Sequence, residues 1–363
     1  MASNIARSNR EGWRIIGAVA GKDLLDAFKN RTLLGIVVGM LLVVLTSQAL
    51  PLLLALRAEQ TVLVYDGGAA PAVAEALAAG NGFSVHTPQS AEVTRTAVGE
   101  SVSAALGLLV PAGTTLTGDP IRLEGVIPYW VAPAARAEIV QGVEAALAEQ
   151  LGAPVEVHVK PVYPAADSSG RHYMASLLLF TVLMLTGMLM TPYLLVDEKE
   201  THTLDALLVS PARVGQIVVG KGLVGLAYCA IAAAVVLAFN TAIVTSWGLL
   251  ALGIAAGAML FVGLGLLLGS LFSNMTALNM AASGVALVLL VPALVAGLPG
   301  ARLTPPVVAL LRWVPSVAFI RVARTAMSGG VATPGTWTNL AGVAAAAVVA
   351  TLAAVRLMGR NRS

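Results

Sequence analysis

The sequence predicts an α-helical integral membrane protein with six transmembrane helices and a small α/β domain between the first and second of them. The 363-residue chain is 57% hydrophobic and 11% charged, and its mean hydropathy of +0.84 is too high for an ordinary soluble domain. Residues 57–171 alone have the composition of a soluble domain. Elsewhere, six runs without Asp, Glu, Lys, Arg or His are long enough to cross a bilayer, which takes about 20 residues; they are residues 33–56, 173–196, 223–245, 248–271, 276–298 and 339–355.

The N-terminal segment, residues 1–32, is predicted to hold an amphipathic helix. Trp13, Ile16, Leu24 and Phe28 recur at helical spacing on one side, and most of the charged residues fall on the other. Such a stripe is typical of a helix that lies in the membrane interface. A helix packed on the rest of the protein is a compatible alternative.

Basic residues predict the orientation, because Lys and Arg concentrate on the cytoplasmic side of a membrane. Six of them precede the first span and three follow the last, against four in the loop of residues 299–338. The protein is therefore expected to cross the cytoplasmic (inner) membrane several times. Both termini, including the tail of residues 359–363, are expected in the cytoplasm. The first span, residues 33–56, is expected to be an uncleaved anchor, since the charged region of about 30 residues before it is too long for a signal peptide.

The domain of residues 57–171 is expected outside the cytoplasm. Strand patterns occur at residues 61–65, 82–86, 104–110, 121–131 and 154–159, the fourth interrupted at Pro128, and helical patterns at 71–79, 91–102 and 133–151. Alternating strands and helices indicate a small α/β domain. No catalytic group of residues stands out in it, because His86 and His158 are isolated from each other and its carboxylates are scattered; we interpret both histidines as surface residues.

Residues 172–358 are predicted to hold the other five spans. Three pairs of glycines at helical spacing, Gly35 and Gly39, Gly253 and Gly257, and Gly265 and Gly269, would let helices approach closely. The loop of residues 299–338 mixes apolar and basic side chains, so we expect one or two helical pieces at the outer membrane face.

A charged segment, residues 197–208, follows the second span. Leu204, Leu207 and Leu208 lie at i, i+3 and i+4 and give a short helix an apolar edge beside Asp205. Residues 197–200 are expected to form a hydrated, mostly acidic cluster. The segment either docks as a helix into a groove of another protein or is an ordinary solvated loop.

The sequence gives little support for a nucleotide, metal or nucleic-acid site in this chain. Residues 215–221 match the spacing GxxxxGK, but Gly222 stands where a P-loop has Ser or Thr, and Ser210 and Pro211 are typical of a helix start. We expect a helix that leads into the third span and no nucleotide site. No spacing indicates a metal site, and no basic run indicates nucleic-acid binding. Because the spans lack ionisable residues, the energy for transport would come from elsewhere, or the chain carries out no active transport.

Residues 198–208, with Ser210-Pro211 and Gly220-Lys221 beyond them, resemble the cytoplasmic loop of type-two ABC export permeases. His202 stands where that family usually has Gly, and Asp205 where it has Glu, while the spacing is kept. The layout is also similar to the drug- and sodium-exporter-like branch, which carries an external domain after the first span.

The resemblance implies a permease that works as a homodimer or heterodimer within the lipid bilayer, together with two separate ABC ATPase subunits. Those subunits would bind the ATP and Mg²⁺, and this chain would bind no cofactor. Within the cytoplasmic loop of residues 197–222, the residues implied to couple to the ATPase are Glu198, Glu200, Thr203, Leu204, Asp205, Leu207 and Leu208.

Two other functions stay open at this point. One is a channel or secondary carrier that works without ATP, and the other is a membrane-anchored sensor or scaffold whose external domain binds a ligand. The substrate stays open too, among sodium ions, drugs, peptides and lipids.

Overall fold

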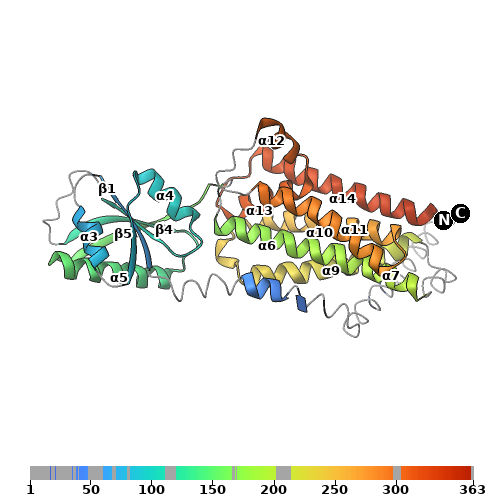
Figure 1. The fold of residues 1–363 in the computed structure, drawn as a ribbon, viewed down its shortest axis with the longest axis horizontal. Helices are drawn as coiled ribbons and strands as arrows, with labels where there is room; N and C mark the ends of the chain where they lie inside the picture. The colour runs from blue at the N-terminus through green and yellow to red at the C-terminus, as the bar shows by residue number, and fades with distance from the viewer. Residues whose placement is uncertain are drawn as a thin grey trace, which may run out of the picture.

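The computed structural model describes most of the chain beyond residue 60. The described residues are 60–67, 71–79, 82–110, 120–165, 168, 170–201, 214–296 and 304–360, with 17, 21, 35, 38, 39 and 41–47 from the N-terminal region. The chain forms an α/β domain at one end of a helical bundle (Figure 1). Both predicted parts are therefore present.

The α/β domain is built on a five-stranded sheet in the order β2-β1-β3-β4-β5. The pairs β1–β2, β1–β3 and β4–β5 are parallel, whereas β3 and β4 are antiparallel. The strands and helices coincide closely with the predicted ones. Their bounds are β1 Gln60–Asp66, α3 Pro71–Ala79, β2 Phe83–His86, α4 Ala91–Glu100, β3 Leu106–Val110, β4 Ile121–Pro128, α5 Pro133–Leu151 and β5 Val155–Val162.

Helices cover both faces of the sheet. Val62 and Val64 of β1 point to a core shared with α3 and α5, while Leu63 and Tyr65 point to a second core beneath α4. This alternation follows from the two-residue period of a strand. His86 and His158 are exposed, as the sequence predicted.

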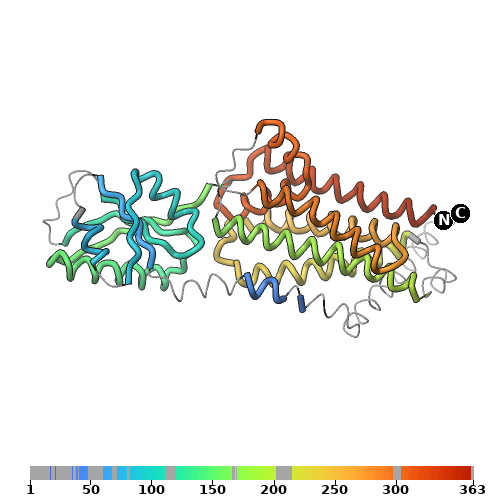
Figure 2. The backbone as a smooth tube through the Cα atoms, viewed as in Figure 1, coloured from blue at the N-terminus to red at the C-terminus, as the bar shows by residue number. Residues whose placement is uncertain are grey.

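The bundle contains five helices long and apolar enough to span a membrane among the described residues, or six if a bent pair is counted as one span. Helix α10 is central, because it packs against α7, α9, α13 and α14 (Figure 2). The bounds are α6 Arg171–Leu185, the π-helical turn η1 Thr186–Met190, α7 Thr191–Glu200, α9 Val214–Ala238, the 3₁₀ turn η2 Thr241–Ile243, α10 Trp247–Leu271, α11 Met275–Val295, α12 Pro305–Leu311, α13 Pro315–Met327 and α14 Pro334–Arg360.

Spans two to six of the prediction correspond to the continuous run α6–η1–α7 and to α9, α10, α11 and α14. The predicted first span lies mostly outside the described residues. Its described part, residues 41–47, is helical, and Val44 is buried in the core of the bundle. The predicted N-terminal helix also lies outside them, apart from Gly17 and Gly21, which are helical.

Two of the predicted glycine pairs lie at close helix contacts. A Cβ on Gly257 would come 2.5 Å from the Phe319 ring of α13, and one on Gly269 would come 3.0 Å from Pro192 Cα of α7. A Cβ on Gly265 would overlap the carbonyl oxygen of Gly187 in η1. The third pair differs, since a Cβ on Gly35 or Gly39 would meet no described atom within 4 Å.

The described part of the predicted loop of residues 299–338 contains two helical pieces, α12 and α13, with an 83° bend between them, before α14 begins at Pro334. Helix α13 lies deeper than a surface helix would. Its Val317, Phe319 and Ile320 are buried among α6, α10, α11 and α14. The apolar residues of this helix explain most of its burial, and Arg324 is buried with them.

Candidate functional site

The predicted coupling segment begins on a helix that continues directly from the second span. Helix α7 runs through the apolar Leu194 and Leu195 to Glu200, so residues 197–200 form its last turn, which we call the charged turn. Thr201 ends the helix, and its hydroxyl donates to the Asp197 carbonyl at 2.7 Å. The charged turn is therefore rigidly connected to the span.

A buried ion pair joins the charged turn to α9. Lys221 Nζ lies 2.9 Å from Glu198 Oε2 and donates to the Leu194 carbonyl at 3.0 Å. The Lys221 side chain is 0% exposed and that of Glu198 is 10% exposed. Charges withdrawn from water are tolerated only with a close partner and further hydrogen bonds, and Lys221 has both.

The next two residues cap the ends of two other helices. Lys199 Nζ donates to the carbonyls of Gly269, Ser270 and Phe272 at 2.7, 3.1 and 2.9 Å, at the C-terminal end of α10. Glu200 Oε1 accepts from the backbone N–H of Met275 at 2.8 Å, at the start of α11. A cation at a helix C-terminus and an anion at an N-terminus both match the helix dipole.

The charged turn thus holds α9, α10 and α11 through three consecutive side chains. The sequence-based expectation of a hydrated acidic cluster was wrong for Glu198, which is buried, and for Lys199, which is half-buried; Glu200 is exposed. The unpaired backbone groups at the ends of neighbouring helices supply partners that a local sequence pattern does not reveal.

The remaining predicted site residues lie outside the described part of the chain. They are Thr203, Leu204, Asp205, Leu207 and Leu208 of the coupling segment, and Trp13, Ile16, Leu24 and Phe28 of the N-terminal helix. Their roles stay predictions.

The GxxxxGK spacing lies on a helix, as predicted. Helix α9 starts at Val214 and includes Gly220 and Lys221, so Lys221 belongs to the ion pair and not to a phosphate-binding loop after a strand. Within the described ranges, no group of three His, Cys, Asp or Glu side chains could hold a metal ion.

A second polar cluster, which we call the junction, lies at the opposite end of the bundle, where the α/β domain meets it. Tyr129, directly after β4, has its hydroxyl 2.9 Å from the Ile243 carbonyl and also donates to the Met327 carbonyl. Burial raises the pKa of the Tyr129 phenol, which keeps the donating proton in place. Tyr163, directly after β5, stacks on Tyr129 with ring centroids 4.8 Å apart.

Arginines complete the junction. The Arg171 guanidinium lies 4.3 Å from the Trp130 ring centroid, and the Arg324 guanidinium lies 5.1 Å from that of Tyr173 and donates to the Ser168 carbonyl. This cluster was not predicted from the sequence. The available signal was the placement of Tyr129, Trp130 and Tyr163 at strand ends, where aromatic side chains often carry contacts between a wet and an apolar region.

Comparison with known proteins agrees with this architecture. The family model described as ABC-2 family transporter protein matches residues 32–356, which include the α/β domain, the charged turn and the bundle helices up to the last turn of α14. A search of curated proteins finds no match. A match over most of the chain, together with membrane-length apolar helices, shows that this protein belongs to the ABC-2 family of membrane transporters.

Proposed function

We propose that the chain is the permease subunit of an ATP-driven exporter, in which two permease chains form the substrate path and separate ABC ATPase subunits hydrolyse ATP. The ATP and Mg²⁺ are bound by the ATPase subunits. Both termini and residues 197–222 face the cytoplasm, and the α/β domain lies on the other side of the membrane.

The observation that carries this proposal is the set of contacts made by the charged turn. Glu198, Lys199 and Glu200 each hold a different helix of the bundle, α9, α10 and α11. A partner that moves the segment after Thr201 therefore displaces the ends of three further helices at once. This arrangement suits a subunit that receives mechanical work and does no chemistry of its own.

Purification with its partner tests the proposal. The tagged full-length chain, taken from its native membrane, is expected to carry a partner subunit that hydrolyses ATP. The variant Leu204→Asp/Leu207→Asp/Leu208→Asp is expected to insert in the membrane but to lose this ATPase activity, because the apolar edge of the coupling segment is replaced by charge.

The matched control places three acidic residues at positions far from the coupling segment. Val93, Val102 and Val331 are all exposed, at 52%, 42% and 86%. Their triple Asp variant is expected to keep the ATPase activity. Loss in both variants, or in neither, would contradict a docking role for residues 204–208.

ATP depletion separates this function from the alternatives. Export that continues unchanged without ATP would favour a channel or secondary carrier. Signalling retained by a truncated chain without the last four spans would favour a sensor or scaffold.

A further inference from the structure

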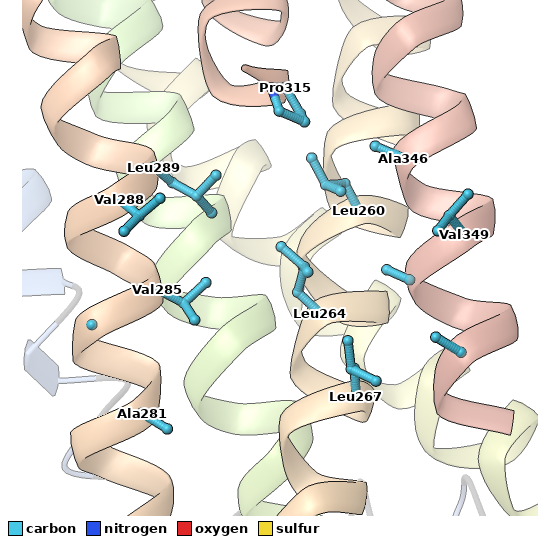
Figure 3. A pocket seen from close by; sticks show the side chains of 13 residues that line it. Leu260, Leu264, Leu267, Ala281, Val285, Val288, Leu289, Pro315, Ala346 and Val349 are labelled. Carbon is cyan, nitrogen blue, oxygen red and sulfur yellow. The ribbon is translucent and has the colours of Figure 1, made fainter. Parts of the chain in front are cut away.

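An apolar groove lies between α10, α11 and α14, with a volume of about 580 Å³ (Figure 3). Pro315, at the start of α13, lies at one end, next to Leu260 of α10 and Leu289 of α11. From there the walls run away from the α/β domain to Leu267 on α10. Leu267 lies seven positions after Leu260 on the same helix, so the groove extends over about 10 Å along the helices.

The walls accept only an apolar occupant. All 13 lining residues are Leu, Val, Ala, Gly or Pro. A cavity without polar partners does not hold ordered water. The flanking helices expose large apolar side chains, among them Val288 at 69% and Val349 at 67%, as expected for helices in contact with hydrocarbon. A lipid acyl chain is therefore the occupant that this setting supplies.

A basic residue continues one wall of the groove beyond its apolar part. Val349, Ala353 and Arg356 of α14 lie at i, i+4 and i+7 and so share one face of the helix. Arg356 is exposed and lies about 4.5 Å beyond Ala353 along the axis. Helical side chains lean towards the N-terminus of their helix, which at Arg356 is the direction of the groove.

The opposite rim differs in charge. Glu200, a carboxylate, occupies the start of α11 through its bond to Met275. Lys199 is engaged by three carbonyls at the end of α10, so among the described residues Arg356 is the basic group that continues the groove on the α14 side. A guanidinium binds a phosphate with two parallel hydrogen bonds.

We propose that the groove binds one acyl chain of an anionic phospholipid, with the phosphate of that lipid at Arg356. The lipid belongs to the leaflet at the bundle end opposite the α/β domain. It fills the space between α11 and α14, which both pack on α10 but are separated by the groove.

The chain offers substitutions that fill the groove without disturbing its walls. A Cβ on Gly284 of α11 would meet no atom within 4 Å, and the same holds for Gly342 of α14, which lies outside the groove. Gly284→Phe therefore blocks the groove, and Gly342→Phe is its matched control on a second exposed helix face. Ala353→Phe blocks the groove from the α14 side.

The test uses the full-length purified chain with spin-labelled phosphatidylglycerol and phosphatidylcholine as probes, each titrated into detergent solution. The unaltered chain and Gly342→Phe are expected to immobilise phosphatidylglycerol in preference to phosphatidylcholine. Gly284→Phe and Ala353→Phe are expected to lose most of the immobilised signal for both lipids. Arg356→Gln is expected to keep the acyl-chain signal and to lower the preference for phosphatidylglycerol about fivefold.

Three results would overturn the proposal. Equal immobilisation by Gly284→Phe and Gly342→Phe would show that the lipid binds elsewhere. An unchanged preference for phosphatidylglycerol in Arg356→Gln would show that the lipid phosphate does not bind Arg356. A disulfide between two chains through Val288→Cys, formed in membranes in high yield, would show that a second copy occupies the groove.

Discussion

Lys221 makes two contacts within the apolar bundle, to the Glu198 carboxylate and to the Leu194 carbonyl. Removing one member of a buried ion pair leaves the other unpaired, at a cost of about 3–5 kcal/mol. We therefore expect Lys221→Met to lower the thermal unfolding temperature of the detergent-solubilised chain substantially.

The double variant Lys221→Met/Glu198→Leu is the control, because replacing both charges with apolar side chains of similar volume is often close to neutral. It is expected to recover most of the lost stability. A single variant as stable as the unaltered chain would show that the ion pair contributes nothing to the fold.

Sequence reasoning could place Lys221 on a helix but could not find its partner. The turn signal at Ser210-Pro211 and the apolar run after Gly222 predicted the helix, and α9 confirms it from Val214 onward. Glu198 and Lys221 lie 23 positions apart on different helices. Their contact depends on how α7 and α9 pack, which no local pattern encodes.

At the scale of elements, α10 approaches its neighbours through glycines. A Cβ on Gly265 would overlap the Gly187 carbonyl and lie 3.0 Å from Pro192 Cδ, and neither backbone nor ring can move away easily. Gly265→Ala is expected to lower stability by about 1–3 kcal/mol, the usual cost of overpacking. Thermal unfolding of the detergent-solubilised chain measures this loss of stability.

Gly248→Ala is the matched change on the same helix, where a Cβ would meet nothing within 4 Å. It should leave stability unchanged or raise it slightly, since alanine is the better helix former. If both variants unfold at the same temperature as the unaltered chain, α10 has more room against η1 than the structure indicates.

The elements themselves were largely predictable. Most strands of the α/β domain had an alternating or β-branched pattern, as in Thr61–Tyr65 within β1, while β3 is a short continuous apolar run. The burial of helix α13 was harder to predict, because its arginines suggested a position at the membrane surface. Arg324 instead lies against Tyr173 and donates to Ser168, so its charge is satisfied while the apolar side of the helix is buried.

For the whole molecule, the junction decides how the α/β domain is held on the bundle. The Tyr129 hydroxyl bonds to the carbonyls of Ile243 and Met327, residues that precede α10 and end α13. Nearby, Gly329 has a φ of 76°, and a Cβ there would lie 2.5 Å from the Tyr163 ring. The contact is therefore close as well as polar.

We expect Tyr129→Phe to loosen the junction without unfolding either part, since each net hydrogen bond contributes about 0.5–1.5 kcal/mol. Hydrogen exchange is expected to become faster at the backbone N–H groups of Thr245 and Ser246, which donate to Ala326, while β3 and β4 keep their protection.

Tyr65→Phe removes the same hydroxyl from β1, away from the bundle, and is expected to leave that exchange unchanged. Equal exchange in the two variants would mean that the Tyr129 hydroxyl does not hold the domain in place.

The pairing of β4 with β5 has a mechanical consequence. Both strands run in parallel towards the bundle, in register from Ile121 opposite Val155 to Pro128 opposite Val162, and each ends one residue before a junction tyrosine. A force between the α/β domain and the helical bundle therefore acts along the strand axes. Because ladder hydrogen bonds run between strands, a tension along the strand axes loads the bonds of the sheet in shear, many at once, and does not open them one at a time. The α/β domain is thus attached to the bundle along its strand axes, the direction in which the sheet resists extension most.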